Sequence, residues 1–173
     1  MRVAADGSIP EHHPNCLGCG SQNPCSMGLR LHVDGDRVRG DVTFDHRHEG
    51  APGIAHGGAI ATVLDDTFGL LLVVLGTPAV TANLSVNYKA SVLLGRPLHV
   101  VGWCVERRGR KLFLQARLED QGTTIADATA LFLVVDTSHF HQGGQQLPPD
   151  WADWSPATAP DPQQIPSPPN RTP

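Results

Sequence analysis

The sequence predicts an α+β domain in which an antiparallel sheet of about six strands wraps around one long buried helix. Three observations indicate this fold class: a long apolar segment without proline, alternation of apolar and polar residues on both sides of it, and short turn sequences between the alternating segments. The predicted order of elements is β-β-α-β-β-β-β. A length of 173 residues is that of a single domain.

The first two strands are predicted at 29–33 and 38–44, where apolar and polar residues alternate. Asp34-Gly35 between them is a turn signal, so the pair is expected to form a hairpin. After the helix, 80–88 alternates again, with its apolar residues at the even positions. Further strands are expected at 98–106, 112–119 and 123–135.

The helix is predicted from Gly57 to Gly76, a segment of 20 residues that is apolar on most sides. A helix that is apolar nearly all round is a buried helix. The alternative is a pair of buried strands, but the length and the Asp65-Asp66 pair in the middle favour a helix. Gly76 and Pro78 are typical of its end.

Composition excludes several classes of protein. A net charge of -4 argues against a dedicated nucleic-acid binder, and no uninterrupted apolar run approaches the length that crosses a bilayer. The first ten residues lack the apolar core of a signal peptide. We therefore expect a cytoplasmic protein without a membrane or nucleic-acid partner, and its four cysteines are predicted to be reduced thiols.

Proline divides the chain, because nine of the 15 prolines fall in 148–173. The predicted organisation is an N-terminal leader over 1–13, a folded domain over 14–137 and an extended or disordered tail over 138–173. Trp151 and Trp154 are candidates for docking the tail onto the domain.

The start of the helix carries the first chemical signal. Gly57 and Gly58 lie where the first backbone N–H groups of a helix have no intrahelical partner and the dipole end is positive. Glycine lets a ligand approach the backbone closely. The segment therefore predicts a site for an anion or a developing oxyanion, with His56 directly before it.

Asp65 carries the second signal, because a carboxylate inside an apolar helix is costly unless it is paired or functional. It shares a helix face with small residues such as Gly58, Thr62 and Gly69. Small side chains leave space on this face for another molecule or another chain to pack. Asp66 points about 100° away. Either aspartate can instead be a buried hydrogen-bonding residue.

The spacing of Gly57 and Asp65 along the helix then predicts the oligomeric state of the protein. Gly57 and Asp65 are eight residues apart, so their backbones are separated by about 12 Å. One helix cannot bring both groups to a single reacting carbon. If both act in one reaction, two antiparallel copies of the helix must supply them, which predicts a homodimer with two sites at its interface.

The segment HGGAIATVLD at 56–65, followed by TANLSVNYK at 81–89, resembles the hotdog-fold acyl-CoA thioesterases of the PaaI type. The leader CLGCGSQNPCSMGLRL at 16–31 and Gly109-Arg110-Lys111 are similar to other parts of that family. The resemblance covers about 14–136 and does not include the tail. It implies a curled sheet around the helix and dimers whose sheets join edge to edge.

The resemblance also implies residue roles. The Gly57 N–H, positioned after His56, would polarise the thioester carbonyl. Asp65 of the partner subunit would act as general base on water, or as nucleophile through an anhydride. Thr81 matches a position whose hydroxyl helps to hold the water or the carboxylate.

Substrate contacts are expected along the same segments and at a basic turn. The residues expected to contact substrate are Gly58, Glu49, Asn83, Arg108, Arg110 and Lys111. Arginine suits the phosphates of CoA, although a solvated turn explains any one of these basic residues equally well. Glu49 lies in a loop where some family members carry an amide, so either a second donor to the carbonyl is absent or Glu49 has another role. Leu64, Phe68 and Leu72 are expected to line the pocket.

The N-terminal segment contains only one C-x-x-C pair, formed by Cys16 and Cys19, with Cys25, His12 and His13 nearby. A structural zinc site needs four ligands, and one such pair supplies two. We therefore expect no metal and no cofactor. The predicted function is hydrolysis of acyl-CoA by a homodimer or a dimer of dimers. Non-catalytic acyl-CoA binding or sensing is the alternative, and a hotdog dehydratase ranks third.

Overall fold

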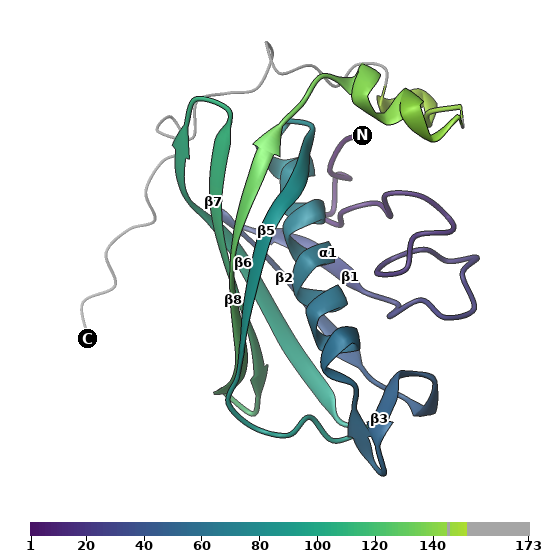
Figure 1. The fold of residues 1–173 in the computed structure, drawn as a ribbon, viewed down its shortest axis with the longest axis vertical. Coiled ribbons are helices and arrows are strands. Elements are labelled where there is room, and N and C mark those ends of the chain that lie inside the picture. The colour runs from purple at the N-terminus through teal and green to yellow at the C-terminus, as the bar shows by residue number, and fades with distance from the viewer. Residues whose placement is uncertain (145, 152–173) are drawn as a thin grey trace.

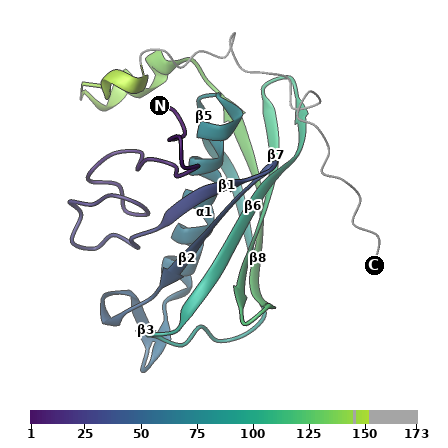
Figure 2. The same cartoon turned by 180° about the vertical axis from the view of Figure 1, so that it is seen from behind.

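The computed structural model describes residues 1–144 and 146–151 (Figure 1). A six-stranded antiparallel sheet with the order β1-β2-β6-β7-β8-β5 curves around one helix, which confirms the predicted fold class (Figures 1 and 2). The main elements are β1 (Arg30–Asp34), β2 (Arg37–Thr43), α1 (Gly57–Leu75), β5 (Ala79–Tyr88), β6 (Pro97–Arg108), β7 (Lys111–Asp120) and β8 (Thr123–Val134).

The helix α1 is the centre of the core. Its buried side chains face the sheet, and Phe68 meets Phe132 of β8 edge to face with ring centroids 5.9 Å apart. The helix ends at Gly76, whose left-handed φ of 60° suits glycine. Length and composition alone would let α1 cross a membrane, but here most of it is buried as the core helix of a folded domain.

The segment between β2 and α1, where the sequence analysis places Glu49 in a loop, contains regular structure. It contains a short 3₁₀ helix (His46–His48) and a small hairpin of β3 (Glu49–Ala51) and β4 (Ile54–Ala55). His48 is buried, and it packs edge to face on Phe44. Its backbone carbonyl accepts a hydrogen bond of 2.7 Å from the His56 N–H, so this hairpin holds the start of α1 in place.

A bulge in β5 changes which residues face the helix. Strict alternation would place Thr81 and Leu84 on opposite faces of the sheet. The register shifts between Thr81 and Asn83, so Ala82 is an extra residue on this strand. Thr81 therefore pairs with buried Phe132, Leu84 pairs with buried Ala130, and both face α1.

Both flanking segments contact the domain. In the leader, Ile9 is buried, and residues 7–9 bond to β1 along its outer edge. Beyond β8, two 3₁₀ helices (Thr137–Gly143 and Pro149–Trp151) are joined by an edge-to-face contact between Phe140 and Trp151. The described part of the predicted tail is thus folded rather than extended, because two aromatic rings anchor it. Trp154 lies outside the described residues.

Phe68→Ala tests the central role of the helix. The Phe68 side chain is fully buried, so we expect its truncation to lower the free energy of unfolding by about 3–5 kcal/mol in urea denaturation. Val105→Ala is the matched control, because this side chain is 54% exposed and its truncation should change stability by less than about 0.5 kcal/mol. Equal effects in the two variants would contradict the core described here.

Candidate functional site

The start of α1 is held by its own N-cap. His56 has extended backbone angles, and its Nδ1 accepts a hydrogen bond of 2.8 Å from the Gly58 N–H. The His56 carbonyl accepts bonds from the N–H groups of Ala59 and Ile60. Tyr88 of β5 donates its hydroxyl to the Gly57 carbonyl at 2.9 Å. The sequence does not predict that last contact, which ties the helix start to the sheet.

The Gly57 N–H takes no part in this capping. Among the hydrogen bonds between described residues, none uses it as a donor. The Gly58 N–H, in contrast, is occupied by the His56 ring. A Cβ on Gly57 would meet only the Tyr88 ring, at an ordinary 3.5 Å. A Cβ on Gly58 would lie 2.9 Å from the His56 ring nitrogen. Gly57 is therefore the backbone donor that remains for a ligand.

Asp65 lies further along α1, beside β5. Thr81 donates its hydroxyl to the Asp65 carboxylate at 2.9 Å, and the bulge at Ala82 makes this contact possible. Burial raises the pKa of Asp65, and the negative charge of Asp66 adds to that effect, whereas the Thr81 hydrogen bond opposes it. A carboxylate with a raised pKa is a stronger base than an exposed one.

A cavity of about 270 Å³ opens beside Asp65. Its polar lining comes from His12, Asp65, Asp66 and Thr81, and its apolar lining includes Leu72, Phe132, Phe140 and Trp151. Of the three residues expected to line a pocket, Leu72 does so. Leu64 and Phe68 are fully buried in the core, because they lie on the helix face that packs on the sheet.

Two predicted substrate contacts lie away from Asp65. Glu49 accepts a 2.6 Å hydrogen bond from the Gly53 N–H and so closes its own hairpin. Asn83 pairs with Leu131 and lines a shallow groove with Val105 and Phe113, which places it on the outer face of the sheet. The bulge is the reason, because it turns Thr81 inward and Asn83 outward.

The basic turn lies at the far end of the domain from the start of α1. Lys111 begins β7, and Arg110 donates to the Val134 carbonyl at 3.0 Å. Val134 pairs with Ala79, the first residue of β5, whereas Tyr88 at the end of β5 contacts the helix start. Arg108 is bonded to Glu106 and lies over the Phe113 ring. Figure 1 shows the β6–β7 turn and the start of α1 at opposite ends of the sheet.

A second polar cluster lies around Asp66 and shares His12 and Asp66 with the lining of the cavity. His12, Cys16 and Cys19 come from residues 1–29 before β1, which are called the leader from here on, and their ligand atoms and that of Asp66 lie within 4.8 Å of one another. All four cysteines of the chain are free thiols. Burial disfavours a charged His12 ring, but the Asp66 carboxylate that accepts its hydrogen bond and the contact with Cys16 outweigh burial and raise the pKa of His12 to about 10. The signal for this cluster is Cys16-x-x-Cys19, whose partner Asp66 is 50 residues away from Cys16.

Comparison with known proteins agrees with this architecture. A family model described as the thioesterase superfamily matches residues 52–126. The mouse protein named acyl-coenzyme A thioesterase THEM4 is 40% identical over 90 residues, which are 51% of this chain and 39% of that protein. This chain therefore spans well under half the length of that curated relative.

Solved structures share the fold. The thioesterase superfamily protein RHA08564 has a TM-score of 0.63 with 29% identity, covering 66% of this chain and 57% of that one. A hypothetical thioesterase from Streptococcus pneumoniae TIGR4, solved with coenzyme A, has a TM-score of 0.58 with 26% identity, covering 61% and 84%. Variants of that protein have been solved with either an aspartate or a threonine replaced by alanine, and the two positions are as far apart as Asp65 and Thr81 here.

The matched segment begins just before α1 and ends within β8, so it contains the helix, its N-cap, Asp65 and Thr81. The family match over residues 52–126, the similarity to THEM4 and the shared architecture together show that this chain contains a hotdog-fold domain similar to those of the thioesterase superfamily.

Proposed function

We propose that this protein hydrolyses acyl-CoA thioesters to a free acid and CoA. The observation that carries the proposal is the pairing of a Thr81-held Asp65 carboxylate, facing a cavity, with an unused Gly57 N–H at a helix N-terminus. The name of the mouse relative and the CoA in the S. pneumoniae structure support the choice of substrate class. The aspartate and threonine positions replaced in the latter protein support the choice of residues.

In the proposed reaction, the Gly57 N–H donates to the thioester oxygen and stabilises the negative charge that develops there. Asp65 removes a proton from water while the water oxygen attacks the carbonyl carbon. The C–S bond then breaks, and the thiolate of CoA takes up the proton. Attack by the Asp65 carboxylate itself, followed by hydrolysis of the anhydride, gives the same products.

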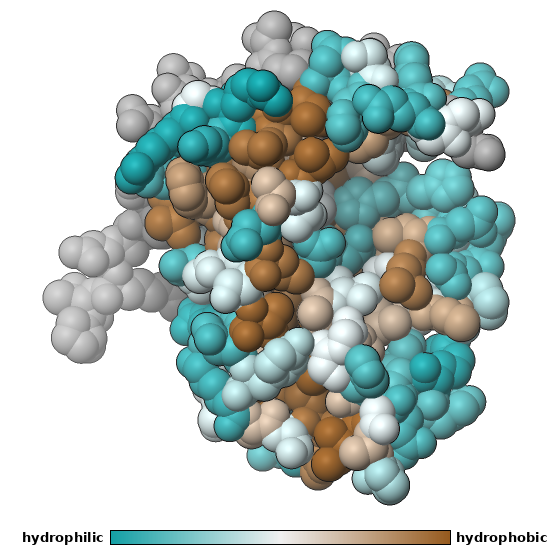
Figure 3. All heavy atoms as spheres, viewed as in Figure 1, coloured by the Kyte–Doolittle hydropathy of each residue, from teal (hydrophilic) through white to brown (hydrophobic). Residues whose placement is uncertain are grey.

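We propose further that Gly57 and Asp65 of one site come from two subunits, because about 12 Å separates them along one helix. β5 is the edge strand that a second copy can extend: residues 7–9 cover the edge at β1, whereas β5 pairs with β8 alone among the described strands. Tyr88 of β5 is 53% exposed. Apolar side chains also gather on the face that carries β5 and α1 (Figure 3).

An antiparallel dimer across β5 would give the basic turn a role. In one subunit, Arg108, Arg110 and Lys111 lie at the end of the sheet opposite the start of α1. Antiparallel pairing brings that end beside the helix start of the partner, which is where the CoA phosphates would enter. We propose that these residues bind the phosphates of CoA in the partner's site.

Asp65→Asn tests the base. The amide is the same size but cannot take a proton, so we expect turnover of acyl-CoA to fall by about 10²–10⁴-fold in a thiol-release assay. Asp41→Asn is the control, because the side chain of Asp41 is 75% exposed and lies outside the cavity. Full activity in folded Asp65→Asn protein would exclude the mechanism. Wild-type protein that binds acyl-CoA but releases no thiol would favour the binding or sensing alternative.

Gly57→Pro tests the oxyanion donor. Proline is well tolerated at the first position of a helix, and His56, at φ -63° and ψ 135°, already has the backbone that precedes proline. The variant should therefore fold, lose the N–H and lose about 10²–10³-fold in kcat. Gly57→Ala keeps the N–H, and its Cβ fits at 3.5 Å from Tyr88, so we expect a smaller loss. Wild-type kcat in the folded proline variant would remove Gly57 from the mechanism.

Mixing these two variants tests the shared site. A hybrid dimer of Asp65→Asn and Gly57→Pro chains contains one site in which both positions are native. After unfolding and refolding together, the mixture should recover about a quarter of the wild-type specific activity, although each variant alone is nearly inactive. A mixture as inactive as its components would show that both groups act within one subunit.

A further inference from the structure

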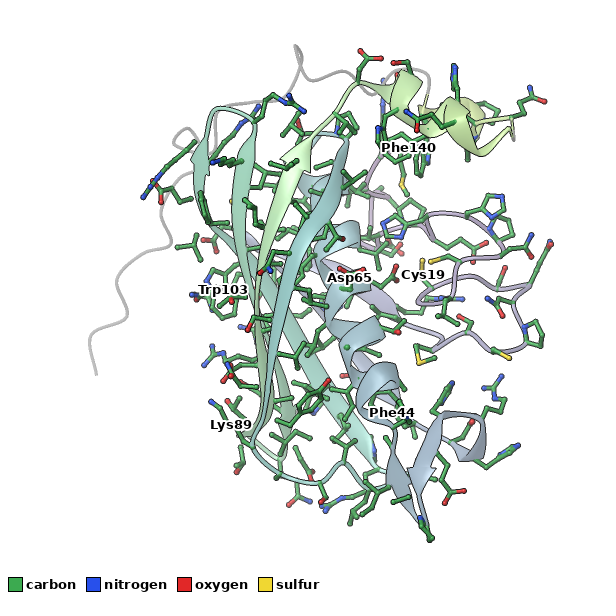
Figure 4. All side chains as sticks on the ribbon, viewed as in Figure 1. Cys19, Phe44, Asp65, Lys89, Trp103 and Phe140 are labelled. Carbon is green, nitrogen blue, oxygen red and sulfur yellow. The ribbon has the colours of Figure 1, made fainter. Side chains whose placement is uncertain are left out.

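The cluster between the leader and α1 provides the kind and number of donor atoms that a tetrahedral metal site needs. The ligand atoms come from His12, Cys16 and Cys19 on one loop and from Asp66 on α1. Figure 4 shows Cys19 in the leader beside the middle of α1, level with Asp65. None of these four residues is assigned a role in the proposed hydrolysis.

The distances between the donor atoms suit a zinc ion. The Asp66 carboxylate lies 3.1 Å from His12 Nδ1 and 3.3 Å from the Cys16 sulfur. The Cys19 sulfur lies 3.5 Å from His12 Nδ1. Tetrahedral zinc with ordinary Zn–N, Zn–O and Zn–S bonds separates its ligands by about 3.3–3.8 Å. Only small movements are therefore needed to enclose an ion.

The loop is shaped for close approach to Asp66 and for stabilising thiolates. A Cβ on Gly18 would lie 2.2 Å from the Asp66 carboxyl carbon, so only glycine fits at position 18. The His12 N–H donates to the Cys19 sulfur at 3.3 Å. A metal ligand must be a thiolate, and this N–H favours the ligating form of Cys19.

Asp66 provides an independent sign of a missing partner. Its side chain is 10% exposed, and its Oδ2 is buried without a hydrogen-bond partner among the described residues. A buried carboxylate oxygen without a partner is costly. On the other side of the cluster, the His12 ring lies against Gly69, where an added Cβ would meet the ring at 2.7 Å.

We propose that His12, Cys16, Cys19 and Asp66 bind one Zn²⁺ ion in a closed structural site. Two thiolates with an imidazole favour zinc over magnesium or calcium. Four protein ligands leave no open position for water, so the ion would fasten the leader to α1 rather than take part in hydrolysis. This proposal replaces the expectation of no metal, which rested on finding only one C-x-x-C pair in the sequence.

Metal analysis of the full chain tests the site. Wild-type protein purified with Zn²⁺ and then desalted should contain about one zinc per chain by mass spectrometry. Cys16→Ser, Cys19→Ser and Asp66→Asn should each lose most of that zinc. Cys25→Ser is the matched control, because this exposed cysteine lies in the same leader but outside the cluster, and it should retain the metal. Removal of zinc with EDTA should lower the Tm of wild type and Cys25→Ser by about 5 °C or more.

A second measurement keeps the proposal falsifiable if the ligand variants fail to fold. Co²⁺ added to metal-free wild-type protein should produce the intense absorption of cobalt–thiolate bonds, and Zn²⁺ should abolish it. Folded wild-type protein that holds less than about a tenth of a zinc per chain and gives no cobalt–thiolate band would overturn the site. So would equal loss of zinc in Cys25→Ser, or a Cys16–Cys19 disulfide in freshly purified protein.

Discussion

Burial of α1 against the concave face of the sheet is the constraint on which the rest of the structure depends. The helix can hide most of its surface, but its polar groups must lie at its N-terminus or along the stripe that the sheet leaves uncovered. Asp65 and Asp66 occupy that stripe, and Gly57 and Gly58 occupy the N-terminus. The chemistry is therefore confined to the places where the hydrophobic core ends.

Two neighbouring aspartates take separate roles because one helical step turns their side chains by about 100°. Asp65 faces β5, where Thr81 holds it at the cavity. Asp66 faces the leader, where His12 and Cys16 surround it. The helix thus supplies one carboxylate for the proposed reaction and another for attaching the N-terminal segment, and the two sites share a wall of the same cavity.

A single bulge in β5 determines the contacts of this strand with both Asp65 and the start of α1. If Ala82 were an ordinary strand residue instead of a bulge, Thr81 and Tyr88, seven positions apart, would lie on opposite faces of the strand. With the bulge, Thr81 bonds Asp65 and Tyr88 bonds the Gly57 carbonyl. Among the described strands, only β8 pairs with β5, so the element that positions the proposed catalytic groups is also the one that would receive a second subunit.

Local patterns in the sequence determined the fold class, the order and approximate bounds of the main elements, the place of His56 directly before the helix and that of Asp65 within an apolar helix. Periodicity and helix-end signals act between residues a few positions apart, so they can be recognised in the sequence. Contacts between distant segments were decided only by the tertiary structure. Strict alternation placed Thr81 and Asn83 on one face, and only the pairing with β8 reveals the bulge that separates them. Cys16 and Asp66 are 50 residues apart, so the four-donor cluster exists only once the leader has folded onto α1. Sequence spacing records neighbours along the chain, whereas a binding site is made by neighbours in space.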